Sequence, residues 1–343
     1  MLHLKPPAWA EAFSARKEEK KNREITSGSE INTPICSSSS SLEGTSSSVS
    51  LHPSSALPAS PLIAELVSSL TNRRLYRELV LALHLGLEDA QADFSFLRIK
   101  GLKALIKALA SLSASDSLIH IFQDSQRDKT LQVVPVLFAH SLAPARSPPV
   151  LPSDPLSLEG PLQVVSPPTD YEVALALRVL EGCCLLDKGS RVLASQHMAV
   201  KELIELLSAG GVLEQGACLD ALPALLLDTP INQQEFLKHQ GVKKISELVK
   251  HGHVDESMRL KCAEFLLLLV GDLLPSGSEE NDELQLSTEG ALEELQELLG
   301  DVVSTVLEQV DQVMASLSSS QSREEVLGSQ AKLLLELLDS STW

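Results

Sequence analysis

Two adjacent cysteines followed by an arginine raise the question of thiol chemistry. A cysteine phosphatase holds its substrate in a loop of the form His-Cys-x5-Arg, in which backbone amides and the arginine enclose the phosphate. Here six residues separate Cys184 from Arg191, and no histidine precedes Cys183 or Cys184. Apolar residues surround both thiols, and an apolar environment disfavours the reactive thiolate. The sequence therefore predicts buried structural cysteines and no phosphatase activity.

A second pattern, His251-x-His253, has a spacing seen in metal sites. A third ligand is not evident nearby, and the two histidines end a helical segment, so a polar helix end is the expected role. The glycine-rich signatures of phosphate loops, of dinucleotide sites and of the hydrolase nucleophile do not occur. We therefore expect no metal, no cofactor and no enzyme activity.

Lysines recur at one position of three similar segments, and they are Lys103, Lys201 and Lys243. The apolar residues of each segment are expected to face a core, which leaves the lysines on the opposite side, towards a groove. One interpretation is that these lysines lie on helix faces that are exposed to solvent. The other is that they form a basic ladder, which attracts an acidic partner segment or the acidic tail of this chain. Salt would weaken this electrostatic attraction.

The elements that carry these lysines repeat along the chain. Val200 and Val242 begin nearly identical segments and lie 42 residues apart. A period of about 40–47 residues built from two or three helices is typical of armadillo and HEAT arrays. A third copy is expected at Gly101, because Phe96 precedes Leu102 by the same interval as an aromatic precedes Val242. The predicted fold class is all-α, an armadillo/HEAT-like helical repeat solenoid.

Composition and charge narrow the class of protein further. Hydrophobic residues make up 43% of the chain and aromatic residues 3%, a mixture that suits close-packed helices. The formal net charge is −18, and residues 271–343 hold 16 acidic and 2 basic side chains. Such a tail repels phosphate, so no nucleic-acid partner is expected. No apolar run is long enough to span a membrane and no signal peptide is recognisable, which predicts an intracellular, cytoplasmic protein without membrane insertion.

The sequence divides into segments of different character. We expect a disordered Ser/Pro-rich segment at 1–60, a repeat domain at 61–274, an acidic linker at 275–290 and amphipathic C-terminal helices at 291–343. Within the repeat domain, a Pro-rich loop is expected at about 143–168. The apolar stripe of the C-terminal helices either caps the end of the array or docks with a partner, including self-association.

Three stretches, 177–194, 225–242 and 258–270, resemble the fungal cell division control protein 14 family of the septation initiation network. This family is distinct from the phosphatase that shares its name. The matching motif residues are Leu180, Glu181, Arg191, Leu226, Asp228, Pro230, Asn232, Gln233, Phe236, Gly241, Val242, Arg259, Leu260, Lys261 and Phe265. The resemblance is sharpest from Tyr171 to Leu274.

The resemblance implies a non-catalytic scaffold or regulatory subunit. Such a subunit would bind a germinal-centre-type protein kinase, support its recruitment to the spindle pole body, and promote septum formation and cytokinesis. No motif identifies the residues that contact the kinase. Exposed Arg259 and Lys261, together with the lysines, are our candidates, so the expected partner-binding set is Lys103, Lys201, Lys243, Lys244, Arg259 and Lys261. The alternative function is a general armadillo-type adaptor that binds acidic or disordered peptides in an unrelated pathway.

Overall fold

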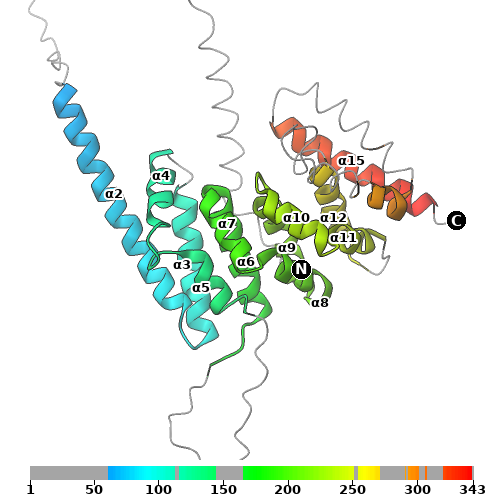
Figure 1. Cartoon of the computed structure of the whole chain (residues 1–343), viewed down its shortest axis with the longest axis horizontal. Coiled ribbons are helices and arrows are strands. Elements are labelled where there is room, and N and C mark those ends of the chain that lie inside the picture. The colour runs from blue at the N-terminus through cyan, green and yellow to red at the C-terminus, as the bar shows by residue number, and fades with distance from the viewer. Residues whose placement is uncertain are drawn as a thin grey trace, which may run out of the picture.

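The computed structural model describes residues 61–112, 116–143, 165–250, 254–270, 290, 293–300, 306 and 320–341. Within these ranges every regular element is a helix, so the all-α prediction is confirmed (Figure 1). The segment 1–60 and the two histidines of the His251-x-His253 pattern lie outside the described residues, as does the acidic linker except for Gly290.

The first two helices pack closely because glycines lie where they cross. Helix α2 (Pro61–Ala90) begins with a proline, which the first turn of a helix accommodates. It packs against α3 (Ser95–Leu112). A Cβ atom at Gly101 of α3 would lie 2.6 Å from the carbonyl oxygen of Gly86 and 2.5 Å from the amide nitrogen of Ala90. Only glycine at this position therefore lets the two backbones approach so closely.

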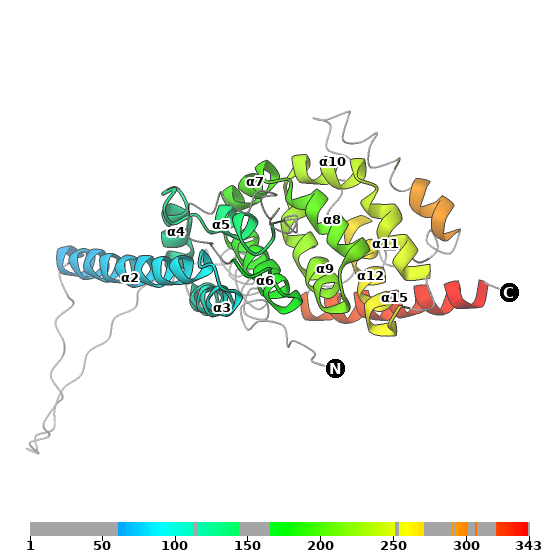
Figure 2. The same cartoon turned by 90° about the horizontal axis from the view of Figure 1, so that it is seen from below.

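The remaining helices follow a long-short-short pattern, which is clearest in two consecutive sets. The helices are α4 (Asp116–Ser125), α5 (Val133–Ala139), α6 (Asp170–Leu186), α7 (Lys188–Gln196), α8 (Ala199–Ala209), α9 (Val212–Leu226), α10 (Pro230–Lys238), α11 (Gly241–Lys250) and α12 (Glu256–Leu268). In the sets α6–α7–α8 and α9–α10–α11, α6 packs on α9, α7 on α10 and α8 on α11. The structure thus repeats the sequence period (Figure 2).

The repeat extends to the backbone conformation between helices. Met198 and Gln240 directly precede α8 and α11, and they adopt left-handed φ values of 55° and 57°. Non-glycine residues seldom have positive φ, so its recurrence at equivalent positions shows that the two sets share one turn geometry. Helix α10 starts at Pro230 with Thr229 as its N-cap residue, although the Thr229 side chain makes no capping hydrogen bond.

The prediction of a third copy at Gly101 is wrong. Helix α3 packs on α6 in line with α9 and α12, and so takes the place of a long helix rather than that of α8 or α11. Phe96 is 68% exposed, whereas its supposed equivalent Phe236 is fully buried. A Cβ atom at Gly241 would meet the Phe236 ring at 2.2 Å, while Gly101 faces α2. The apolar spacing misled because it fits any helix with one buried face.

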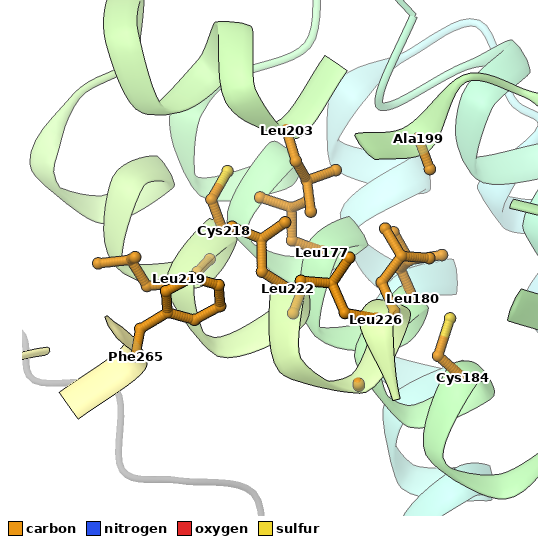
Figure 3. Packing of buried hydrophobic residues seen from close by; sticks show 14 of the residues in the cluster. Leu177, Leu180, Cys184, Ala199, Leu203, Cys218, Leu219, Leu222, Leu226 and Phe265 are labelled. Atoms are coloured by element: carbon orange, nitrogen blue, oxygen red, sulfur yellow. The ribbon is translucent and has the colours of Figure 1, made fainter. Parts of the chain in front are cut away.

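The core is aliphatic and contains the cysteines. Leu177, Leu180 and Cys184 of α6 meet Leu222 and other residues of α9 (Figure 3). Figure 3 also shows Leu203 of α8 and Phe265 of α12 entering this contact region. The thiols of Cys183, Cys184, Cys218 and Cys262 are free and buried, which confirms the burial predicted for Cys183 and Cys184.

The C-terminal region packs back on the chain itself. Helix α15 (Ser320–Ser341) packs against α12, and its Ala331 and Leu334 are buried (Figure 1). From the predicted apolar stripe, Leu295, Leu299 and Val306 are also buried in the common core. The described part of this stripe therefore covers the chain's own apolar surface.

Candidate partner-binding surface

Two of the predicted lysines occupy equivalent positions on equivalent helices. Lys201 and Lys243 follow Val200 of α8 and Val242 of α11, and both valines are buried. The Lys201 side chain is 38% exposed and lies 3.7 Å from Glu205 on the same helix, while Lys243 is exposed. The repeat geometry therefore presents one lysine from each set on the outer side of these helices.

Two other predicted lysines, Lys103 and Lys244, differ from this pair. Lys103 lies on α3, and its Nζ atom is 5.3 Å from the ring centroid of Tyr171 at the start of α6. An ammonium group at this distance from an aromatic ring makes a cation–π contact. Because α3 is not equivalent to α8 and α11, Lys103 is not a third rung beside Lys201 and Lys243. Lys244 is half-buried on α11.

A row of charged side chains crosses the long helices α6, α9 and α12. We call Arg178, Glu181, Asp220 and Lys261 the charged row. Lys261 of α12 donates to Asp220 of α9, with 2.7 Å between Nζ and Oδ1. Burial and, secondly, the negative charge of Asp220 raise the pKa of Glu181 to about 8, against the opposing effect of Arg178 and Lys261. Glu181 is therefore protonated at neutral pH, when its carboxyl group is able to donate a hydrogen bond.

The sequence pointed to half of the charged row. Glu181 and Lys261 were among the residues that carry the family resemblance, and Lys261 was a predicted partner-binding residue. Arg178 and Asp220 were missed, yet they lie 42 residues apart, which is the repeat period. Superposing the two repeats in sequence would have placed these opposite charges at one structural position.

Arg259 is not exposed, contrary to our expectation. Its side chain is 12% exposed, and its guanidinium donates to the carbonyl oxygen of Val249 at 2.8 Å. It also forms an ion pair with Asp339 of α15, with 2.6 Å between Nη2 and Oδ1. The hydrogen bond from Arg259 lowers the pKa of Asp339. Arg259 therefore attaches the C-terminal helix to α12, and its contact with a partner stays a prediction.

A buried ion pair fixes α3 to α6. The side chains of Arg98 and Glu172 are 2% and 0% exposed, with 2.7 Å between Nε and Oε1. Ser95 and Ser141 donate to the Glu172 carboxylate at 2.5 and 2.8 Å. Arg98 also donates to the carbonyl oxygen of Ser166 at 2.8 Å. Partners on every side offset the cost of burying both charges, so this is a structural joint.

Arg191, the residue that suggested a phosphate site, also has a structural role. Its guanidinium donates to the carbonyl oxygen of Cys184 at 2.9 Å and to that of Leu227. The Asn232 amide donates to the carbonyl oxygens of Leu225 and Arg191 at 2.8 and 3.3 Å. These side chains satisfy carbonyl groups near the ends of α6 and α9, so they join the two repeats.

The thiols show no sign of activation. Burial raises the pKa of Cys184 to about 12 and that of Cys262 to about 12, and it also raises the pKa values of Cys183 and Cys218. In the described residues, no three His, Cys, Asp or Glu side chains are grouped so that they could hold a metal ion. The described helices likewise include none with the length and apolar character needed to cross a membrane.

Comparison with known proteins bears on the region of the repeats. Searches of curated proteins and of solved structures found no match. A family model described as "Cell division control protein 14, SIN component" matches residues 163–332, which include the charged row. The resemblance read from the sequence is therefore confirmed, and through this segment the chain belongs to the cell division control protein 14 family of septation initiation network components.

Proposed function

We propose that this protein is a non-catalytic scaffold or regulatory subunit of the septation initiation network that binds a germinal-centre-type protein kinase. The observation that carries the proposal is the family match over residues 163–332. Buried thiols with raised pKa values and the structural use of Arg191 agree with a role in binding. In this role the protein promotes septum formation and cytokinesis, and it works in the cytoplasm with recruitment to the spindle pole body.

The proposed architecture is an armadillo-like solenoid. Its support is the repeated long-short-short pattern, the recurring left-handed turns before α8 and α11, and the ordered contacts of α3, α6, α9 and α12. Arrays of this kind bind partners along an extended surface to which each repeat contributes a few side chains. The charged row and the pair Lys201 and Lys243 are two such sets.

The proposed kinase-binding residues are the charged row together with Lys201 and Lys243. In the charged row, a half-buried carboxyl group and a paired lysine lie side by side. A partner that presents both a hydrogen-bond acceptor and a carboxylate would match Glu181 and Lys261. Self-association through the C-terminal helices remains a further proposal, and it requires surface other than the side chains already buried against α12.

A quantitative pull-down from dividing cells tests the proposal. We expect the kinase as a stoichiometric partner of the wild-type chain, and its absence would refute the proposal. The variant Lys201→Glu/Lys243→Glu should weaken kinase binding about tenfold at low salt and less at high salt. The control Lys188→Glu/Lys238→Glu makes the same charge change on exposed residues of α7 and α10 and should leave binding unchanged. Undiminished binding of the first variant would exclude the lysine pair.

The second candidate is a general armadillo-type adaptor for acidic or disordered peptides. The observation that favours it is the equivalent placement of Lys201 and Lys243, which suits an extended acidic ligand running from one repeat to the next. The same pull-down separates the two functions. Recovery of acidic, unstructured partners without the kinase supports the adaptor.

A further inference from the structure

Helix α2 has apolar residues on two opposite sides. On one side Leu79, Leu83 and Leu87 are at most 6% exposed and face the rest of the fold. The other side carries six large aliphatic residues, each between 53% and 61% exposed. We call this set the outer stripe, and it consists of Ile63, Leu66, Val67, Leu70, Leu81 and Leu85.

The outer stripe lies on one face along most of the helix. At about 3.6 residues per turn, its six positions fall on the side roughly opposite Leu83. Its span from Ile63 to Leu85 corresponds to about 33 Å at about 1.5 Å per residue. Both views show α2 at one edge of the molecule, with α3 on its inner side and its first turns extending beyond α3 (Figures 1 and 2). Two groups of exposed aliphatic residues on one face over this length mark an interaction surface.

A charged pair interrupts the outer stripe near its middle. Arg74 and Glu78 lie one turn apart, with 2.8 Å between Nε and Oε1, and their side chains are 79% and 57% exposed. Tyr76 lies midway between them in sequence, and it also lies midway between Val67 and Leu85. Along this face the apolar residues Val67 and Leu70 come first, the Arg74–Glu78 pair with the exposed Arg77 follows, and Leu81 and Leu85 come last. The positions of the apolar residues and of the pair are nearly symmetric about the level of residue 76.

We propose that the outer stripe binds the outer stripe of a second copy of this chain, with the two α2 helices antiparallel and related by a two-fold axis near Tyr76. This pairing places Arg74 of each copy opposite Glu78 of the other. It also places Val67 opposite Leu85, and Leu70 next to Leu81. One patch then serves both subunits, as two-fold symmetry requires. A parallel pairing in register would instead bring Arg74 against Arg74, which is unfavourable.

The first test is the mass of the full-length chain in solution, measured by analytical ultracentrifugation over a concentration series. We expect a reversible dimer. The variant Leu70→Glu/Leu81→Glu should be monomeric, because it places charges in the apolar contact. The control Ser68→Glu/Ser69→Glu adds the same charge to exposed α2 positions away from the outer stripe and should remain dimeric. Circular dichroism checks that each variant keeps its helices.

The second test distinguishes this register from any other use of the stripe. Arg74→Glu alone sets Glu against Glu, and Glu78→Arg alone sets Arg against Arg, so each should dimerise roughly tenfold more weakly than wild type. An equimolar mixture of the two variants should form a heterodimer, because every facing pair is again of opposite charge. A monomeric wild-type chain, or a mixture no tighter than its components, would overturn the proposal. A monomer whose outer stripe becomes protected on binding another protein would assign the surface to that protein.

Discussion

Glu181 is a carboxyl group that the fold keeps protonated at neutral pH. Its pKa rises from an ordinary value of 4.5 to about 8, chiefly because the group is removed from water and secondly because Asp220 is close. Between about pH 4.5 and pH 8, the folded chain therefore binds one more proton at Glu181 than the unfolded chain does. Its contribution to the free energy of unfolding is complete below about pH 4.5 and is lost as the pH rises towards 8.

Replacing this carboxyl group by a neutral amide should remove that pH dependence. We expect Glu181→Gln to resemble wild type near pH 4.5 and to exceed it by roughly 1–3 kcal/mol in free energy of unfolding at pH 9. Urea denaturation at a series of pH values measures the difference. The control Glu336→Gln changes an exposed carboxyl on α15. Parallel profiles for Glu181→Gln and wild type would show that the carboxyl is ionised in the folded chain.

Buried polar residues mark the limit of what the sequence could predict at this scale. Arg98 and Glu172 lie 74 residues apart, and arginine and glutamate are usually exposed, so nothing local identified them as a buried pair. Arg259 was expected to be exposed, but it donates to Val249 of α11 and pairs with Asp339 of α15. Lys201, Lys243 and the buried cysteines were predictable, because a repeated apolar pattern fixes which side of a helix faces the core.

At the scale of elements, the ion pair between Arg98 and Glu172 should couple α3 to α6. Arg98→Met leaves a buried carboxylate without its counter-charge, and we expect it to lower the free energy of unfolding by about 3–5 kcal/mol. Arg98→Met/Glu172→Gln removes both charges while keeping an acceptor for the two serine hydroxyls. This double variant should be less destabilised than the sum of the single changes, as measured by chemical denaturation. Additive effects would mean that the two side chains act independently.

Helix α15 provides a second prediction at this scale. Leu334 is 1% exposed in the region where α15 packs on α12, so Leu334→Asp places a charge in an apolar contact. We expect the free energy of unfolding to fall by roughly 3 kcal/mol and hydrogen exchange to become faster in both helices. Lys332→Asp, at an exposed position of the same helix, is the matched control. Unchanged exchange in α12 would contradict the packing of α15 on it.

The elements themselves were largely predictable, because 3.6-residue periodicity is a local property. The relation between α6–α8 and α9–α11 was also predictable, since the two sets have similar amino-acid sequences as well as a common period. The place of α3 was not. Its Gly101 segment resembles α8 and α11, but Gly86 on α2 decides its neighbours, and that contact joins separate helices.

For the whole molecule, the two proposed interfaces are separate. The outer stripe lies on α2, before the residues 163–332 that match the family, and the charged row lies within them. We therefore expect Leu70→Glu/Leu81→Glu to retain kinase binding, and Lys201→Glu/Lys243→Glu to retain the dimer. Ultracentrifugation and the quantitative pull-down, applied to both variants, check this. Loss of both properties in either variant would show that the interfaces depend on each other.

The hydrogen bonds around Arg98 and Glu172 also predict how the chain behaves when it is divided into two fragments. Ser141 and Ser166 are 25 positions apart in the sequence. Ser141 on one side and Ser166 on the other both bond to this ion pair. A polypeptide divided between the two serines would keep every one of these bonds, so its two fragments should reassemble as a complementation pair.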